Sequence, residues 1–369
     1  MMMRDQVRRF VDREVVPFAE AWEEDGKIPR DIFRRMGELG FLGMRHATEF
    51  GGTDLGPIAS IVFAEELARS GFGGFTASTL VHTDMSAIHI TKSGTTAQKQ
   101  TFLPAIIRGE KICAVAVTEP DAGSDVARLR TRATRDGDSW VINGAKMFIT
   151  NGVYGDIIIL AARTDPSAKG SGGISLFIVE KDTPGISTTK LSKHGWLCSD
   201  TAEIGLSNVR IPAENILGVE GRGFYAIMET FQNERICIGG ICAGESAKAI
   251  ELTLQYVRAR EAFGGPLWNQ QAVRQKLAML AAKSAAVRQL AYHAAELSSL
   301  GTNCLREVFM VKALAPEVLH EVVHGCLQLH GGAGFMRGTA IERMARDARV
   351  LTIGGGATEV MLEEVAKRM

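Results

Sequence analysis

The spacing of apolar residues divides the chain into three blocks, and the first of them is helical. Between residues 4 and about 108, apolar side chains recur three or four positions apart, as in Val7, Phe10 and Val11. This period predicts amphipathic helices. A second helix is predicted for IASIVFAEELA, because Pro57 before it suits the first turn of a helix.

The period changes at Ile112, where short apolar or alternating stretches begin. ICAVAVT, SWVING, DIIILAA, GISLFIVEK and ISTTKL are rich in Ile, Val and Thr and are separated by Gly, Asn, Asp and Pro. These features predict strands. Helical spacing returns from Gly221, over roughly 222–261, 269–300 and 303–330, with Pro316 as an expected kink and a last helix opening near Ala357. Four such helices favour a bundle.

We therefore predict an α+β fold with an N-terminal α-helical domain at 1–111, a middle β domain at 112–218 and a C-terminal helical bundle at 219–369. The 42 basic and 42 acidic residues cancel, and no long run of like charge occurs. This balance argues against a nucleic-acid or membrane partner. No apolar stretch approaches the roughly 20 residues of a membrane span.

Cysteine usage and the N-terminus bear on the compartment. The six cysteines form no C-x-x-C pair, so we read them as small buried apolar residues in a reducing environment. The first residues, MMMRDQVRRFVDREVV, lack the apolar core of a secretory signal and carry too many acids for a transit peptide. The sequence thus favours a bacterial cytoplasm over a mitochondrial matrix.

A literal zinc motif occurs late in the chain. His320, Glu321 and His324 spell HEVVH, and the two histidines would share one face of a helix. His330 stands where a third ligand would follow in a longer zinc pattern, but Leu327 replaces the glycine which that pattern needs. A zinc hydrolase is the alternative; two ordinary bundle histidines are the favoured interpretation. QLHGGAG also fails as a dinucleotide fingerprint, since G-x-G-x-x-G is incomplete and no strand precedes it.

The segment AVAVTEPDAGSDVA begins as a buried strand and then turns through small residues. Such a turn exposes backbone N–H groups and hydroxyls, which suits a flat ring or a phosphate. It could equally be a plain β-turn.

Five motifs together resemble the acyl-CoA dehydrogenase family, over nearly the whole chain. In order they are AVTEPDAGSDVA, INGAKMFITNG, REAFGGPL with Gln271 following, CLQLHGGAGFMRG and ARDARVLTIGGGATEVM. The resemblance implies a helical domain, a small β-barrel domain and a four-helix domain, with FAD as cofactor and an acyl-CoA as substrate. It further implies fatty acid β-oxidation chemistry, an electron-transfer flavoprotein as electron acceptor, and a homotetramer.

The resemblance also implies roles for single residues. Val117 and Thr118 would meet the flavin ring, Phe148 would pack on it, and Thr150 would hydrogen-bond near flavin N5. Arg260 and Gln271 would reach the FAD of a neighbouring subunit. The further FAD contacts that it implies are Phe263, Gln328, Gly331, Gly332, Thr358 and Glu359. The implied acyl-CoA contacts are Ser124 and Arg235, and no metal ligand is implied.

The reaction of this family needs a carboxylate base, which removes the proton alpha to the thioester. Many members carry it as a Glu at the position of Gly355, where this chain has no acid. In the long-chain and isovaleryl-like branch the base is a Glu directly before an Arg, and FQNERICIGG supplies Glu234. We expect Gly355 N–H to polarise the thioester carbonyl. Without the resemblance, Glu234 would read as a solvated partner of Arg235; the apolar residues that follow predict burial and a raised pKa.

Some positions depart from the usual residues of the family: Arg128, Leu197, Gly338 and Ala357. The segment from Val81 to Met85, together with FQNER, resembles citronellyl-CoA and long-chain members and hints at long or branched acyl groups. A flavin-dependent monooxygenase or oxidase of the same superfamily is the second hypothesis. A catalytically silent relative that binds nucleic acid or scaffolds a complex is a third, opposed by the neutral charge and by Glu234.

Overall fold

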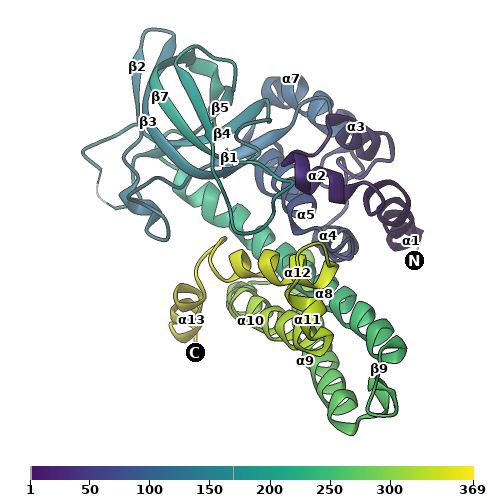
Figure 1. The fold of residues 1–369 in the computed structure, drawn as a ribbon. Coiled ribbons are helices and arrows are strands. Elements are labelled where there is room, and N and C mark those ends of the chain that lie inside the picture. Colours follow the sequence, from purple (N-terminus) through teal and green to yellow (C-terminus); the bar gives the residue numbers. More distant parts are fainter. Residues whose placement is uncertain (1, 169) are drawn as a thin grey trace.

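The structure is a computed structural model that describes residues 2–168 and 170–369. Helices of the N-terminal part lie beside a β domain, and a group of long helices extends away from both (Figure 1). This order of helical, β and helical parts confirms the predicted α+β fold.

The N-terminal helices follow the predicted apolar period. Their bounds are α1 (Met2–Phe10), the π-helical η1 (Val11–Val15), α2 (Ala19–Asp25), α3 (Arg30–Glu38), the short η2 (Thr48–Phe50), α4 (Pro57–Ala68), α5 (Gly73–Leu80), the π-helical η3 (Val81–Ala87), α6 (Ile88–Ser93) and α7 (Thr96–Ile107). Local signals set several ends. Pro57 opens α4, and a capping box of Thr95 and Gln98 opens α7.

The middle domain is built on one mixed sheet, which has eight strands among the described residues. They are β1 (Cys113–Ala116), β2 (Arg132–Asp136), β3 (Ser139–Thr150), β4 (Ile157–Arg163), β5 (Ile174–Glu180), β6 (Ile186–Lys190), β7 (Thr201–Pro212) and β8 (Ile216–Leu217). The strand order is β6-β7-β3-β2-β4-β5-β8, and β1 pairs in parallel with β4. Short 3-10 turns lie at Val126–Arg128 (η4) and Ala213–Asn215 (η5).

The pattern of apolar residues did not predict β2 and β7. In β2, RATRD, a single residue is buried, so the strand shows no apolar alternation. In β7 the alternation of buried positions breaks at Ser207 and Asn208, which are both exposed, and Asn208 has a positive φ. Pairing with β3 along nearly its whole length holds β7 in place, which is a long-range effect that local pattern does not carry.

The C-terminal part contains α8 (Gly223–Ala259), the hairpin strands β9 (Glu261–Ala262) and β10 (Gly265–Pro266), the 3-10 turn η6 (Leu267–Asn269), α9 (Gln271–Ser299), α10 (Leu305–His330), α11 (Gly332–Phe335), α12 (Ala340–Asp347), the 3-10 segment η7 (Ala348–Thr352) and α13 (Thr358–Ala366). Helix α10 continues through Pro316. Three of the four predicted helices are the long α8, α9 and α10, and the predicted last helix is α13. The sequence analysis did not predict α12 as a separate helix.

Helix α8 connects the three parts of the molecule. It packs against α4 of the N-terminal part, against α9 and α10, and at its start against β5 (Figure 1). One apolar cluster contains residues of both helical parts, such as Phe63, Ile236 and Val311. The six cysteines are all free and buried, as predicted. Across the described residues, no helix combines the length and apolarity needed to cross a membrane.

A buried carboxylate ties the three parts together. Asp347 at the end of α12 accepts hydrogen bonds from Trp196 N in a loop of the β domain, at 2.6 Å, and from Gly73 N at the start of α5, at 3.1 Å. Burial raises the pKa of Asp347 to about 7. One side chain therefore joins segments of each part that lie far apart in the sequence.

The close packing of α8 on α4 gives a first prediction. A Cβ at Gly244 would lie 2.1 Å from the backbone oxygen of Glu65 and 2.9 Å from Ala68 Cβ. Alanine normally stabilises a helix by about 1 kcal/mol relative to glycine, but the clash here should cost more than that, since overpacking costs about 1–3 kcal/mol. We expect Gly244→Ala to lower the thermal unfolding midpoint, followed by circular dichroism.

The control is Gly123→Ala. A Cβ at Gly123 would meet nothing within 4 Å, and the backbone there is not left-handed, so this variant should unfold close to the wild-type temperature. If the thermal unfolding midpoint of Gly244→Ala equals or exceeds that of wild type, α4 and α8 can move apart to fit the added methyl group without a loss of stability.

Candidate active site

The structure brings Glu234 and Gly355 together, although 121 positions separate them in the sequence. Gly355 has φ +69°, and a Cβ built on it would lie 3.0 Å from Glu234 Oε1 and 2.8 Å from Ile238 Cδ1. The carboxylate of α8 therefore occupies the space beside this backbone. An acidic side chain at position 355 would collide with it.

The environment of Glu234 suits a base. Its side chain is partly accessible although it is densely surrounded by protein, and the residues from Ile236 to Ile241 are all buried. Burial raises the pKa of Glu234, and the positive charges of Arg235 and Lys312 offset part of that rise. No hydrogen bond to the carboxylate from the rest of the described chain contributes. The carboxylate is thus free to accept a proton.

Two buried cations hold the glycine turn next to Glu234. Arg235 Nε donates to Gly355 O at 3.1 Å, and Lys312 Nζ donates to Gly356 O at 2.6 Å. Both carbonyls are held by side chains from helices, while the N–H of Gly355 donates to no other described residue. That N–H is therefore available to an incoming acceptor. The sequence reasoning missed Lys312; the signal was a lysine within the apolar run VFMVKALA.

The predicted flavin segment after β1 lies against a bulge in β3. Met147 N donates to Thr118 O at 2.9 Å, and the register with β7 shifts between Lys146 and Ile149. Within this shift Phe148 has φ +63° and is 68 % exposed. The bulge therefore presents a bare aromatic ring beside Val117 and Thr118, with Thr150 two residues further along the strand.

A buried ion pair between Lys146 and Glu119 holds the segment after β1 in place. Lys146 Nζ donates to Glu119 Oε1 at 2.8 Å and to Val117 O at 3.0 Å. Burial lowers the pKa of Lys146 to about 8, and the carboxylate of Glu119 opposes that fall. Glu119 also accepts from Arg130 N and Thr131 N. These hydrogen bonds hold the turn after β1 in place, which favours a turn that is shaped to meet a ligand over an ordinary β-turn.

The first half of α8 connects the two regions. Val117 and Ile227 belong to one apolar cluster, against which Phe231 also packs, and the guanidinium of Arg235 lies 5.6 Å from the centre of the Phe231 ring. The predicted flavin segment and the Glu234 carboxylate thus belong to one continuous region of the molecule.

A second set of predicted cofactor residues lies at the opposite end of α8. Its members are Arg260, Phe263, Gln271, Gln328, Gly331 and Gly332. The ends of α8 and α10 are joined there, because Tyr256 Oη donates to His330 O at 3.2 Å. At about 1.5 Å per residue, Arg260 lies roughly 39 Å along α8 from Glu234. The structure therefore brings the predicted residues into two groups and not into one.

The remaining predicted residues lie near one group or the other. Ser124 is exposed in the turn after β1, and Glu359 is exposed on α13. Thr358 donates to Glu317 Oε1 at 3.1 Å. Of the departures from the family pattern, Arg128 and Gly338 are exposed, Leu197 is half-buried, and Ala357 precedes the first turn of α13.

The residues present fit an FAD. An exposed aromatic ring next to a strand end offers a flat apolar contact, which an isoalloxazine can use. At the other end of α8, Arg260 is exposed, and a Cβ at Gly331 or Gly332 would meet nothing within 4 Å. A guanidinium and open backbone are what a pyrophosphate needs.

HEVVH does not form a metal site. Glu321 makes an ion pair with Lys283, at 2.6 Å. His330 stacks on Tyr256 with ring centres 4.2 Å apart, and its Nε2 lies 3.2 Å from Thr253 Oγ1. Across residues 2–168 and 170–369, no three metal-ligating side chains are grouped to hold an ion. The structure thus favours the interpretation of ordinary bundle histidines.

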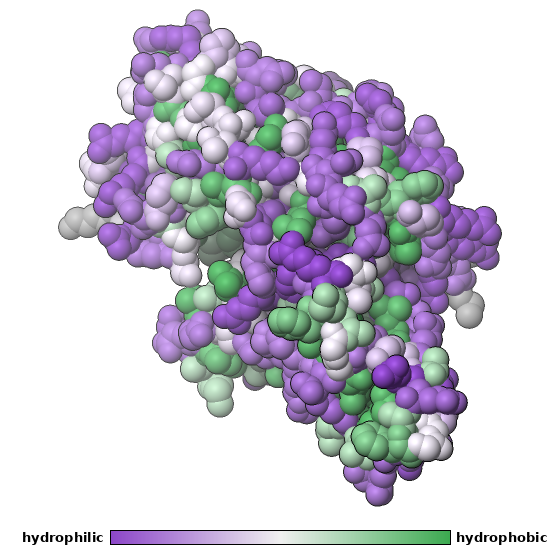
Figure 2. Space-filling model, in the orientation of Figure 1, coloured by the Kyte–Doolittle hydropathy of each residue, from purple (hydrophilic) through white to green (hydrophobic). Residues whose placement is uncertain are grey.

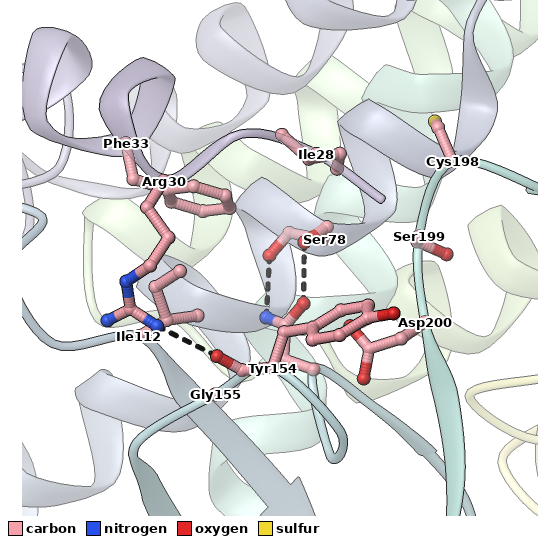
Figure 3. A pocket seen from close by; sticks show the side chains of 11 residues that line it. Ile28, Arg30, Phe33, Ser78, Ile112, Tyr154, Gly155, Cys198, Ser199 and Asp200 are labelled. Atoms are coloured by element: carbon pink, nitrogen blue, oxygen red, sulfur yellow. Dashed lines mark hydrogen bonds between the residues drawn. The ribbon is translucent and has the colours of Figure 1, made fainter. Parts of the chain in front are cut away.

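A small enclosed cavity elsewhere does not belong to this chemistry. It lies between α3, α5 and the β domain, where Ser78 and Asn151 exchange hydrogen bonds and Arg30 donates to Tyr154 O (Figure 3). Its volume of about 20 Å³ has room for one water molecule. We interpret it as part of the domain interface.

Comparison with protein-family models gives matches to all three parts. The chain matches the acyl-CoA dehydrogenase N-terminal domain over residues 1–110, the middle domain over 114–209 and the C-terminal domain over 221–369.

Relatives and solved structures agree. A (2S)-methylsuccinyl-CoA dehydrogenase of Cereibacter sphaeroides is 38% identical over the whole chain, which covers 69% of that protein. The mitochondrial long-chain specific acyl-CoA dehydrogenase of Rattus norvegicus is 37% identical, with 86% of it covered. A putative acyl-CoA dehydrogenase structure from Mycobacterium smegmatis has a TM-score of 0.96 at 41% identity, covering 100% of this chain and 96% of that one. A glutaryl-CoA dehydrogenase from M. smegmatis, in complex with FADH2, has a TM-score of 0.93 at 30% identity, covering 99% and 93%.

The raised pKa of Glu234 has a consequence for stability. Because the folded state holds this carboxyl at a higher pKa than the unfolded state, ionising it disfavours folding, and this cost grows as pH rises above about 4.3. We expect Glu234→Gln to unfold at a higher temperature than wild type near pH 8. The gap should narrow toward pH 4, and thermal scans across pH check it.

Glu229→Gln provides the control, since Glu229 is exposed on the same helix and pairs with Lys92. Its midpoint should follow that of wild type at every pH. A gap between Glu234→Gln and wild type that stays constant with pH would show that the carboxyl keeps an ordinary pKa.

Proposed function

The chain belongs to the acyl-CoA dehydrogenase family, and on this basis we propose that it converts an acyl-CoA thioester to the trans-2-enoyl-CoA with Glu234 as the base. It is a flavin-dependent oxidoreductase, and its cofactor is FAD. When bound, FAD accepts the hydride from the beta carbon of the substrate.

The observation that carries the proposal is the contact between Glu234 and Gly355. The carboxylate lies beside an unengaged backbone N–H. In this arrangement Glu234 takes the alpha proton, while Gly355 N–H donates to the thioester carbonyl oxygen and stabilises the negative charge that develops there. Burial holds the pKa of Glu234 above its ordinary value, which matches a base to work near neutral pH.

Arg235 and the β-domain bulge supply the rest of the site. Arg235 anchors the turn through Gly355 O and so restricts the backbone next to the Gly355 N–H. Phe148, Val117, Thr118 and Thr150 would hold the flavin ring. Ser124 is placed near the acyl-CoA, and Thr358 and Glu359 are placed near the cofactor by family likeness alone.

We further propose that the enzyme works as an oligomer in which each FAD is held by two chains. Arg260, Phe263 and Gln271 follow the end of α8 that is remote from Glu234. They would therefore serve the FAD of a neighbour, with Gln328, Gly331 and Gly332. Apolar side chains are exposed in this region: Phe263 is 90 % and Phe335 84 % exposed, and Figure 2 shows apolar surface over the lower helices. Family likeness favours a homotetramer.

Several features stay predictions. They are a role in fatty acid β-oxidation, an electron-transfer flavoprotein as acceptor, a bacterial cytoplasmic location and a preference for long or branched acyl groups. The oxygen-using alternative predicts rapid oxygen consumption with acyl-CoA and no added acceptor. Metal-dependent hydrolysis is disfavoured by the ion pair of Glu321.

The base assignment is tested by flavin bleaching. Under anaerobic conditions, a panel of short, long and methyl-branched acyl-CoAs should include one class that bleaches the flavin absorbance of wild type. Glu234→Gln should be slower by about 10²–10⁴-fold with that class, the usual contribution of a positioned base. Glu229→Gln should match wild type, and a Glu234→Gln variant at the wild-type rate would remove Glu234 from its role.

The shared cofactor site is tested by FAD retention. We expect Arg260→Ala to bind FAD about 10- to 150-fold more weakly, because a hydrogen bond from a charged donor is worth about 1.5–3 kcal/mol. The control is Arg306→Ala on the exposed start of α10. FAD content and fluorescence titration of the apoprotein measure both. Unchanged affinity in Arg260→Ala would place the pyrophosphate elsewhere.

A further inference from the structure

Lys312 is a fully buried lysine on the apolar face of α10. Its Nζ donates to Gly356 O at 2.6 Å, and no carboxylate of the described chain lies within ion-pairing distance. Burial lowers its pKa to about 8. Burying a charge is costly unless the charge is paired and hydrogen-bonded, and the single hydrogen bond to Gly356 O compensates only part of that cost.

The Lys312 side chain passes close to Gly355 in the glycine turn. Its Cε lies 3.6 Å from the point where a Cβ of Gly355 would stand, and Glu234 Oε1 lies 3.0 Å from the same point. The lysine stem and the carboxylate thus flank one small space at Gly355. Both groups therefore lie on the same side of Gly355, and the two charges are close enough to influence each other.

We propose that Lys312 is the positioning residue of Glu234: it fixes the glycine turn through Gly356 O and keeps the carboxylate ionised for proton removal. The inference rests on the proposed function, since it gives Lys312 a role in setting the base. Deprotonation of the substrate transfers one proton to Glu234, and Lys312 keeps its own proton throughout.

The other charged groups nearby do not replace it. Glu234, Arg235 and Cys242 of α8 and Glu317 of its own helix face Lys312. Glu317 accepts from Thr358, and burial raises the pKa of Cys242, so that this thiol stays neutral.

The charge of Arg235 is engaged differently. Its guanidinium lies 5.6 Å from the Phe231 ring centre and 5.2 Å from that of Phe309, and Glu364 of α13 faces it. Arg235 opposes the effect of burial on the pKa of Glu234 more strongly than Lys312 does, and Lys312 is the second cation that acts on this carboxylate.

The test combines rates with stability. Lys312→Met keeps the length and shape of the side chain without its charge, and Lys312→Arg keeps the charge. In anaerobic bleaching with the most active acyl-CoA, we expect the acid limb of the rate–pH profile of Lys312→Met to move up by about one pH unit. This makes bleaching about tenfold slower at a fixed pH on that limb. Lys312→Arg should keep the limb in place even if its plateau rate falls.

A second readout does not depend on catalysis. Glu234→Gln is made in the wild-type and Lys312→Met backgrounds, and thermal midpoints are compared near pH 7, below the pKa of about 8 of Lys312, so that the lysine is charged. Without the cation, ionised Glu234 disfavours folding more strongly, so the gain from Glu234→Gln should be larger in Lys312→Met. The control, Lys283→Met, removes an exposed lysine that pairs with Glu321 and should leave the gain unchanged.

The outcomes distinguish a failure of the role proposed for Lys312 from a failure of the proposed reaction. Equal gains in both backgrounds, or a Lys312→Met profile with the wild-type acid limb, would reduce Lys312 to a structural residue. If no acyl-CoA bleaches wild type but the gains still differ, the coupling of Lys312 to Glu234 stands and the proposed reaction falls.

Discussion

The site depends on a single exclusion at Gly355. The space beside this backbone holds one carboxylate, and Glu234 of α8 fills it, so a side chain at position 355 would displace both Glu234 and Ile238. The turn must therefore be glycine while the acid is on the helix. With φ near +69° at Gly355 and +110° at Gly356, the backbone adopts a conformation that other residues rarely take. A glycine at position 355 and an acid at position 234 of α8 therefore depend on each other.

This exclusion also explains why the turn needs so many anchors. A glycine-rich segment has more freedom to lose than any other, and that freedom would blur the direction of the N–H. Arg235 and Lys312 each take one carbonyl of the turn, and both come from long helices that share the apolar core. Rigid helices thus hold the glycine turn. In the β domain, Lys146 holds the segment after β1 in a similar way, through Val117 O and Glu119.

Sequence reasoning succeeded where the signal is local. Helical periods located α8, α9 and α10, and the run after FQNER predicted the raised pKa of Glu234, whose side chain is nevertheless partly accessible. It failed where contacts between distant segments decide. Strand β2 carries one buried residue, and the role of Lys312 depends on a turn more than 40 positions away. HEVVH has the spacing of a zinc motif, but the favoured interpretation of two ordinary bundle histidines agrees with the ion pair of Glu321 and Lys283. Family likeness, not pattern, pointed to Glu234, and its catalytic role stays a prediction.

Asp347 has a consequence for how such a chain can change over evolution. Its carboxylate accepts from the β-domain loop and from α5 while belonging to α12, so each of the three parts contributes one element of the same buried joint. If one of the three parts were replaced by that of a relative, the loop, helix start or acid that it brings would have to match the two groups of the other parts. The three parts recognised by separate family models should therefore be inherited together, and hybrids that exchange one part should assemble poorly even when each sequence is sound.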